Sequence, residues 1–162
     1  MALTYEPIAT TTLGSDNTSV TFSSIPSTYT DLVLVICGTQ ASQSDSIIRF
    51  NSDSGSTYSR TAFYQSGTST ASLVQANQSG IAFSYFNTSI GMAVLNINNY
   101  ANSTIYKTVL SAHNGAGATQ NSVTAGTWRN TAAITTIDLY SGGSTYAYQT
   151  GTIFTLYGIK AA

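Results

Sequence analysis

Leu32-Val33-Leu34-Val35-Ile36-Cys37 is a continuous apolar run that begins directly after Asp31. The run is far shorter than the ~18 apolar residues of a membrane-spanning helix, and valine and isoleucine favour β-strands. An apolar run without alternation is typical of a strand that is buried on both faces or lies at the centre of a sandwich. We therefore place this strand in the middle of a sheet and expect Cys37, the single cysteine, to be a small buried side chain.

Segments on both sides of this run alternate between apolar and polar residues, and the three-four spacing of an amphipathic helix is absent. The segments with a strand pattern are residues 3–13, 20–22, 47–50, 57–64, 81–86, 92–97, 104–112, 122–129, 134–140 and 152–159. With the apolar run they predict about nine to eleven strands, and thus an all-β fold: a two-sheet antiparallel β-sandwich, jelly-roll-like. Turn residues predict hairpins between 47–50 and 57–64 and between 92–97 and 104–112.

We treat residues 1–162 as a single β-sandwich domain, because no internal repeat or linker divides them. Residues 1–13 are rich in threonine and contain Pro7, which cannot donate within a sheet, so they predict an N-terminal arm or an edge strand. Residues 66–78 have the weakest pattern and predict the longest loop. We predict that the arm and the loop contact a partner, through Leu3, Tyr5, Pro7, Ile8, Ser66, Gly67, Thr68, Ser69 and Thr70.

Charged residues make up only 7% of the chain, and the formal net charge is -1. The five cations are scattered, so no basic stripe for nucleic acid is expected. No apolar stretch is long enough for a membrane helix, and the N-terminus lacks the pattern of a secretory signal, so we expect synthesis in a cytoplasm. A net charge this close to zero favours association, which predicts a surface that contacts neighbouring proteins.

Groups that could perform catalysis are few: six carboxylates, one histidine and one cysteine. Asn51-Ser52-Asp53-Ser54-Gly55 is similar to the start of a calcium loop, but Ala62 stands where the late glutamate belongs, and an ordinary hydrogen-bonded turn is favoured. His113 could act as a base for Ser111, but a turn histidine is favoured. We predict no catalytic, cofactor-binding or metal-binding residue and no enzyme activity, although folding could still pair two carboxylates.

The aromatic residues allow two interpretations. Eight tyrosines either include a sugar-stacking platform or, as their alternation favours, pack in the core and on sheet faces; they are Tyr58, Tyr64, Tyr85, Tyr100, Tyr106, Tyr140, Tyr146 and Tyr148. Trp128 either anchors a contact with another protein or plugs the sandwich, and the plug is slightly favoured.

Three stretches carry a resemblance to known proteins: Arg49 to Arg60, Trp128-Arg129-Asn130-Thr131, and the ending Phe154 to Lys160. They resemble small virion proteins of tailed bacteriophages, especially phages of aquatic bacteria and cyanobacteria. The motifs are turns followed by strands and carry no chemistry, so no binding residue is transferred from them. The resemblance implies a part of the phage particle.

Two roles in the particle remain open. A capsid decoration or cement protein is a compact, charge-poor β domain on the outer capsid surface, whose partners are the major capsid protein and copies of itself in a trimer or dimer. A tail-fibre or receptor-binding tip would instead bind host glycans with its aromatic residues. We favour decoration, because the sequence contains neither helical heptads nor fibre repeats that could form a trimeric shaft.

Overall fold

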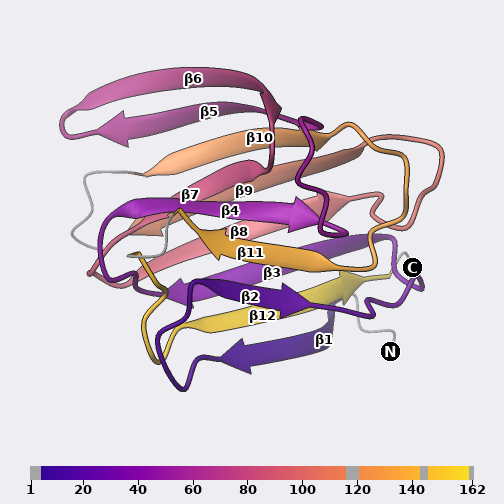
Figure 1. Cartoon of the computed structure of the whole chain (residues 1–162), viewed down its shortest axis with the longest axis horizontal. Coiled ribbons are helices and arrows are strands. Elements are labelled where there is room, and N and C mark those ends of the chain that lie inside the picture. The colour runs from indigo at the N-terminus through magenta and orange to yellow at the C-terminus, as the bar shows by residue number, and fades with distance from the viewer. Residues whose placement is uncertain (1–4, 116–120, 143–145, 161–162) are drawn as a thin grey trace.

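The computed structural model describes residues 5–115, 121–142 and 146–160, which form strands and turns without a helix (Figure 1). No candidate for a membrane-spanning helix therefore occurs in these ranges. The strands are β1 (Tyr5–Thr12), β2 (Ser19–Phe22), β3 (Asp31–Gly38), β4 (Ser44–Phe50), β5 (Tyr58–Ser66), β6 (Ser69–Gln78), β7 (Ile81–Phe86), β8 (Gly91–Asn98), β9 (Lys107–Gly115), β10 (Ser122–Trp128), β11 (Ile137–Ser141) and β12 (Ile153–Ile159).

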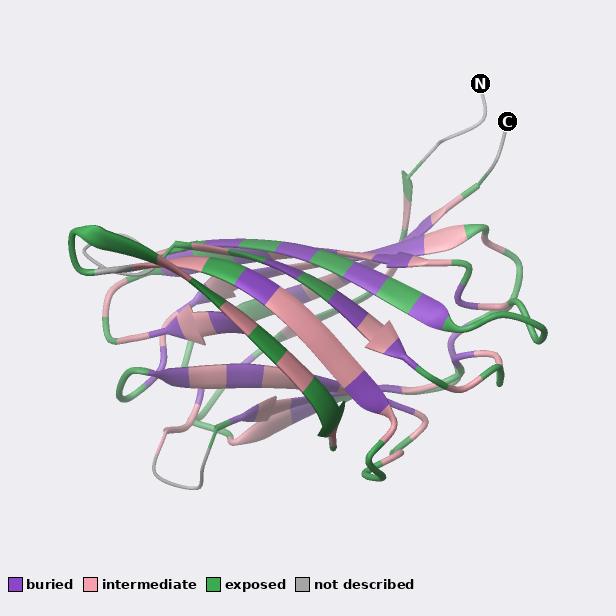
Figure 2. Cartoon of the chain, turned by 90° about the horizontal axis from the view of Figure 1, so that it is seen from above, coloured by how far each residue is buried: buried purple, intermediate pink, exposed green. Residues whose placement is uncertain are grey.

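The strands form two antiparallel sheets that pack face to face (Figures 1 and 2). The large sheet has the order β1-β12-β3-β8-β9-β10-β5-β6, and the small sheet has the order β2-β11-β4-β7. Without β5, β6, β9 and β10, the remaining strands have the order of a jelly roll, in which the chain crosses repeatedly between the sheets. The predicted antiparallel, jelly-roll-like sandwich is confirmed, and two inserted pairs, β5–β6 and β9–β10, widen the large sheet beyond β8.

The apolar run forms most of β3, which lies between β12 and β8 as expected for a strand inside a sheet. Leu32, Leu34 and Ile36 are fully buried between the sheets. The opposite face is less covered than the run predicts: Val33 is buried, but Val35 and Cys37 are half-buried. The prediction of a fully buried Cys37 is therefore wrong.

The predicted loop at residues 66–78 is wrong for most of its length, because Ser69–Gln78 is strand β6. Gly67, with a φ of 61°, makes the turn that lets Ser66 pair with Ser69. Small and polar side chains hid the strand pattern, although alternate residues such as Leu73 are half-buried. This additional strand raises the number of strands in the described residues to twelve.

Of the two predicted hairpins, β8–β9 is confirmed by their antiparallel pairing. The other is wrong, because β4 pairs with β7 and β11 in the small sheet whereas β5 lies in the large sheet. The turn at Asn51 and Ser52, both with positive φ, instead carries the chain from one sheet to the other.

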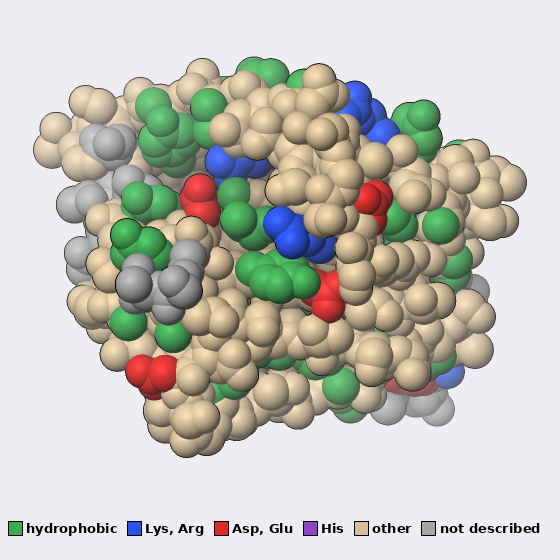
Figure 3. Space-filling view, viewed as in Figure 1, with side chains coloured by type: hydrophobic (Ala, Val, Ile, Leu, Met, Phe, Trp, Pro, Cys, Tyr) green, Lys and Arg blue, Asp and Glu red, His purple; other side chains and the backbone are tan. Residues whose placement is uncertain are grey.

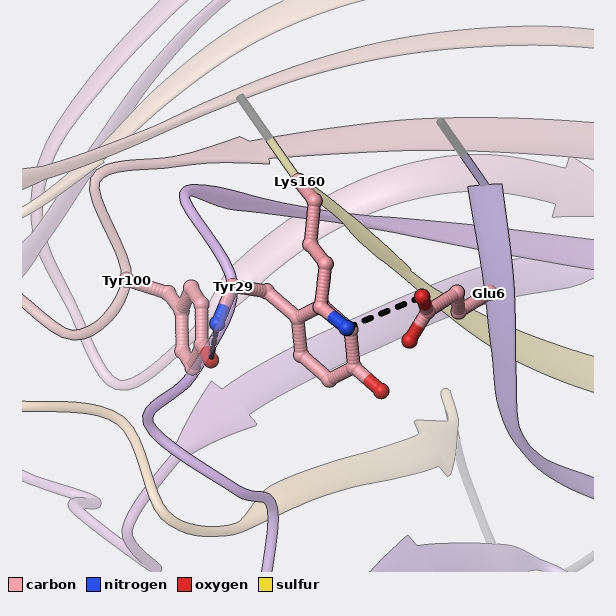
Figure 4. Close-up of polar contacts among 4 residues, drawn as sticks. All are labelled: Glu6, Tyr29, Tyr100 and Lys160. Atoms are coloured by element: carbon pink, nitrogen blue, oxygen red, sulfur yellow. Dashed lines mark hydrogen bonds and ion pairs between the residues drawn. The ribbon is translucent and has the colours of Figure 1, made fainter. Parts of the chain in front are cut away.

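Residues 5–12 form an edge strand and not a free arm, since β1 pairs with β12 along its length. The register shifts between Pro7 and Ala9, as expected of a proline that cannot donate within a ladder. A surface ion pair of 2.9 Å joins Lys160 Nζ to Glu6 Oε1 beside Tyr29 (Figure 4).

Tyr29 connects this edge to the loops at the end of the sandwich (Figure 4). Its backbone N–H donates to the Tyr100 hydroxyl over 3.2 Å, and that hydroxyl donates to the Pro26 carbonyl. The Tyr29 ring lies against the backbone of Gly158 in β12, where a Cβ atom would stand 2.3 Å from the ring carbon Cγ. Only glycine at position 158 leaves room for this ring.

We predict that Gly158→Ala destabilises the protein by about 2 kcal/mol, because the added methyl group displaces the Tyr29 ring. Urea unfolding would measure the change in the free energy of unfolding. Gly14→Ala is the matched control, since no atom lies within 4 Å of a Cβ at position 14. Equal losses in the two variants would contradict this account of the edge.

Candidate functional site

The outer face of the large sheet, which we call the broad face, presents alternate residues of all its strands. Buried and exposed positions alternate along these strands (Figure 2), because successive side chains in a strand point to opposite faces. Cross-strand pairing aligns the outward residues into rows. The central row is Thr10, Thr155, Val35, Val94, Ala112, Val123, Phe63 and Ser72.

The rows on either side of the central row are also uncharged. One row consists of Pro7, Tyr157, Val33, Asn96, Leu110, Ala125, Thr61 and Val74. The other row begins with Thr12, Ile153, Cys37, Met92 and Asn114. It continues through hydrogen bonds between amide side chains, from Asn114 to Asn121 over 2.8 Å and from Asn121 to Gln65 over 2.9 Å.

The broad face collects exposed apolar side chains. Seven large hydrophobic residues that are exposed in the structure lie on it: Tyr5, Phe63, Val74, Met92, Leu110, Val123 and Ile153. Val74 and Phe63 are the most exposed, at 75% and 65%. Phe63, Met92 and Val123 line a shallow depression of about 800 Å³. A neutral, partly apolar surface of this width has the chemistry of a protein contact.

The predicted contact residues lie around the broad face but do not come together. Tyr5 and Pro7 are on β1 at one edge of the large sheet, and Ser66 to Thr70 lie at the β5–β6 turn, at the opposite edge. Ile8 packs against the core and is half-buried. Leu3 lies outside the described residues.

The centre of the broad face was missed by the sequence analysis. The exposed Leu110 follows the buried Val109, and the exposed Phe63 follows the buried Ala62. At these two places the strand therefore carries apolar side chains on both of its faces. The signal available in the sequence was apolar residues at positions that alternate with the buried ones. Such residues look like ordinary strand residues as long as it is not known which face of the strand meets solvent.

The calcium-like turn is a structural connection. Asp53 Oδ2 accepts hydrogen bonds from Trp128 Nε1 over 2.8 Å and from Thr57 Oγ1 over 2.9 Å, while Oδ1 accepts from the Gly55 N–H over 2.8 Å. The indole hydrogen bond is the largest cause that lowers the pKa of Asp53. Trp128 is buried and stacks on Tyr58, with 6.2 Å between ring centroids, which confirms that it plugs the sandwich. Among the described residues, no group of three or more acidic, histidine or cysteine side chains could hold a metal ion.

His113 is not a turn residue, as the sequence predicted, but an inward-facing residue of β9 with 4% of its surface exposed. Its ring packs edge-on against the Phe86 ring, with 4.9 Å between the ring centroids. Neither ring nitrogen of His113 has a hydrogen-bond partner among the described residues. Burial lowers the pKa of His113 to about 4. Ser111 donates instead to the Phe83 carbonyl over 3.1 Å, so no serine–histidine pair forms.

Comparisons with known proteins add little to this geometry. No protein-family model matches the chain, and no curated protein matches it. Among solved structures, it is similar to the marine PL-14 alginate lyase from Aplysia kurodai, with 13% identity over 85% of this chain and 72% of that chain. The TM-score is 0.34, and a similarity this weak carries no inference about activity or ligands.

We predict that acidification destabilises the protein through His113. Between its ordinary pKa of 6.5 and its folded pKa of about 4, the unfolded state takes up a proton and the folded state does not. The free energy of unfolding should therefore fall by up to about 3 kcal/mol from pH ~7 to pH ~4, and this contribution should be constant below pH ~4.

Urea unfolding across this pH range would measure the loss, with His113→Leu as the comparison. Both proteins keep all carboxylates, so the difference between their pH profiles isolates the histidine. Parallel profiles would show that His113 does not cause the acid sensitivity.

Proposed function

We propose that this chain is a non-enzymatic structural protein of a phage virion that decorates and cements the outer capsid surface. The resemblance of its turn and strand motifs supports a place in the virion. The three uncharged rows of the broad face support docking onto other proteins. The partners in this proposal are the major capsid protein and further copies of the chain, as a dimer or trimer. The observation that carries the proposal is the set of three adjacent uncharged rows across the large sheet.

The dimensions of the broad face are consistent with a stable contact. Eight strands spaced by ~4.8 Å span about 34 Å, and three rows extend over about 20 Å, which gives an area of roughly 700 Å². A standard interface buries about 800 Å² on each partner. Binding through such a face would come from apolar burial and neutral hydrogen bonds, so it should be nearly independent of salt.

The second hypothesis, a tail tip that recognises host glycans, has weaker support on the exposed surface. Exposed aromatic side chains should then gather at one end of the sandwich. Among the described residues, the exposed large aromatics are Tyr5 on β1, Phe63 on β5 and Tyr106 just before β9. Because β1 and β5 lie near opposite edges of the large sheet, these residues form no common platform, and decoration remains the proposed role.

We predict that Val123→Glu lowers affinity for expanded capsids at least about tenfold, because a buried, unpaired carboxylate is costly at an interface. Ile105→Glu is the matched control, since Ile105 is also exposed but lies in the connection between β8 and β9, outside the three rows of the broad face. Co-sedimentation with capsids would measure binding. Unchanged binding of the Val123 variant, or collapse of wild-type binding between about 50 mM and about 500 mM salt, would refute docking through this face.

We also predict that immunogold label directed at this protein is spread over the heads of intact phage particles. This experiment tests position separately from the docking surface. Label confined to the tail end would replace decoration with host recognition.

A further inference from the structure

A second hollow lies on the other side of the large sheet. The strands β5 and β6 extend past β7, the last strand of the small sheet. Together with β10, their inner face forms a cleft of about 240 Å³ with the β7 edge. Figure 3 shows this side of the molecule, with basic, acidic and apolar side chains close together between β7 and the β5–β6 pair. The cleft is lined by Asp45, Arg60, Tyr64, Ser84 and Tyr85, among others.

Asp45 differs from the other carboxylates of the chain. Glu6, Asp16, Asp31, Asp53 and Asp138 each accept a hydrogen bond from a described residue. No such bond reaches Asp45 from the described part of the chain. Burial raises the pKa of Asp45, while the nearby Arg60 charge opposes that rise. A partly buried carboxylate without a partner is costly to retain unless something else hydrogen-bonds to it.

Arg60 is fixed in place beside this carboxylate. Its Nε donates to Gln75 Oε1 over 2.7 Å, and its Nη1 donates to the Ala82 carbonyl of β7 over 2.6 Å. Among the described residues, Lys160 and Glu6 form the one ion pair with a nitrogen–oxygen distance of 4.0 Å or less. The guanidinium of Arg60 and the carboxylate of Asp45 are therefore more than 4.0 Å apart. The cleft therefore presents one donor group and one acceptor group of opposite charge, with space between them.

Hydroxyl groups complete the lining. Ser84 is 95% buried, and its Oγ has no hydrogen-bond partner in the described structure. The hydroxyls of Tyr64 and Tyr85 also lack a bond to any described residue, and Ser122 and Thr124 add two more hydroxyls. Hydroxyls both donate and accept, and the tyrosine rings add flat apolar walls.

We propose that this cleft binds one neutral sugar residue. Opposite charges that cancel favour an uncharged ligand, and hydroxyls that outnumber the charges favour a polyol over an amino acid. A volume below the ~300 Å³ of the smallest drug-sized pockets suits a single ring and excludes an oligosaccharide. In this arrangement Asp45 accepts from two sugar hydroxyls, Arg60 donates to a third, and the tyrosines contact the C–H face of the ring.

The proposal goes beyond capsid decoration and is tested without a capsid. The cleft opens between the sheets beside β7, whereas the broad face is the outer surface of the large sheet. Docking through the broad face would leave the cleft free to meet glycans of another surface. A negative result for sugar binding therefore does not contradict capsid decoration, and a negative result for capsid binding does not contradict the sugar site.

Titration of the ¹⁵N-labelled full chain with D-glucose, D-galactose, D-mannose and N-acetylglucosamine tests the site by two-dimensional NMR. We expect at least one sugar to give saturable shifts that centre on residues 45, 60, 84 and 85, with a Kd on the order of 1–10 mM for so small a ligand. Asp45→Asn should weaken that binding at least about tenfold, and Tyr85→Phe several-fold, because each removes hydrogen bonds and keeps the shape.

Tyr106→Phe is the matched control for the loss of a phenol, since Tyr106 is exposed and outside the cleft. The spectra themselves show whether each variant is folded. The proposal is overturned if no sugar saturates below about 100 mM, a concentration well above the expected Kd. It is equally overturned if L-alanine binds in place of the sugars, or if both cleft variants bind as tightly as the wild type.

Discussion

The continuous register of the large sheet is the constraint on which the other features depend. Because side chains alternate between faces, a slip of one residue between β9 and β10 would exchange the core for the surface along the whole strand. Close approach of the two sheets holds this register: at Gly126 in β10, an added Cβ would stand 2.8 Å from the Ile81 side chain of β7. The same register aligns apolar residues inside the sandwich and neutral residues along the broad face.

Several of the few charged side chains close loops of the chain through hydrogen bonds to backbone carbonyls. Arg49 and Arg129 donate to backbone carbonyls of Ser79 and Ser56, each over 2.7 Å. Lys107, although its surface is fully buried, donates to two backbone carbonyls. The charges thus replace backbone hydrogen bonds that turns cannot make themselves. These three cations are engaged within the chain, so a charge-poor sandwich can present three neutral rows on its outer face and still have satisfied loops.

The fold class was predictable from local pattern, whereas the pairing of several individual strands was not. Alternation within residues 104–112 or 152–159 predicts strands without reference to the rest of the chain. The choice between a hairpin and a crossover after Phe50 depends on the positive φ of Asn51 and Ser52 and on the pairing of β4 with β7, which is distant in sequence. The strand at 69–78 was missed because a face of serine, threonine and alanine resembles a loop until its partner β5 is known.

The two candidate sites also differ in how far the sequence predicts them. The broad face was predicted only at its edges, from proline, glycine and composition, because its centre consists of ordinary strand residues that become a surface through the sheet order. The cleft could not be predicted at all, since Asp45, Arg60 and Tyr85 come from three strands and meet only where the β5–β6 pair extends beyond the small sheet. That overhang is a direct consequence of inserting two strand pairs into one sheet of a jelly roll. The insertion therefore creates both features at once: it widens the outer face for docking, and it leaves an inner face that the small sheet is too narrow to cover.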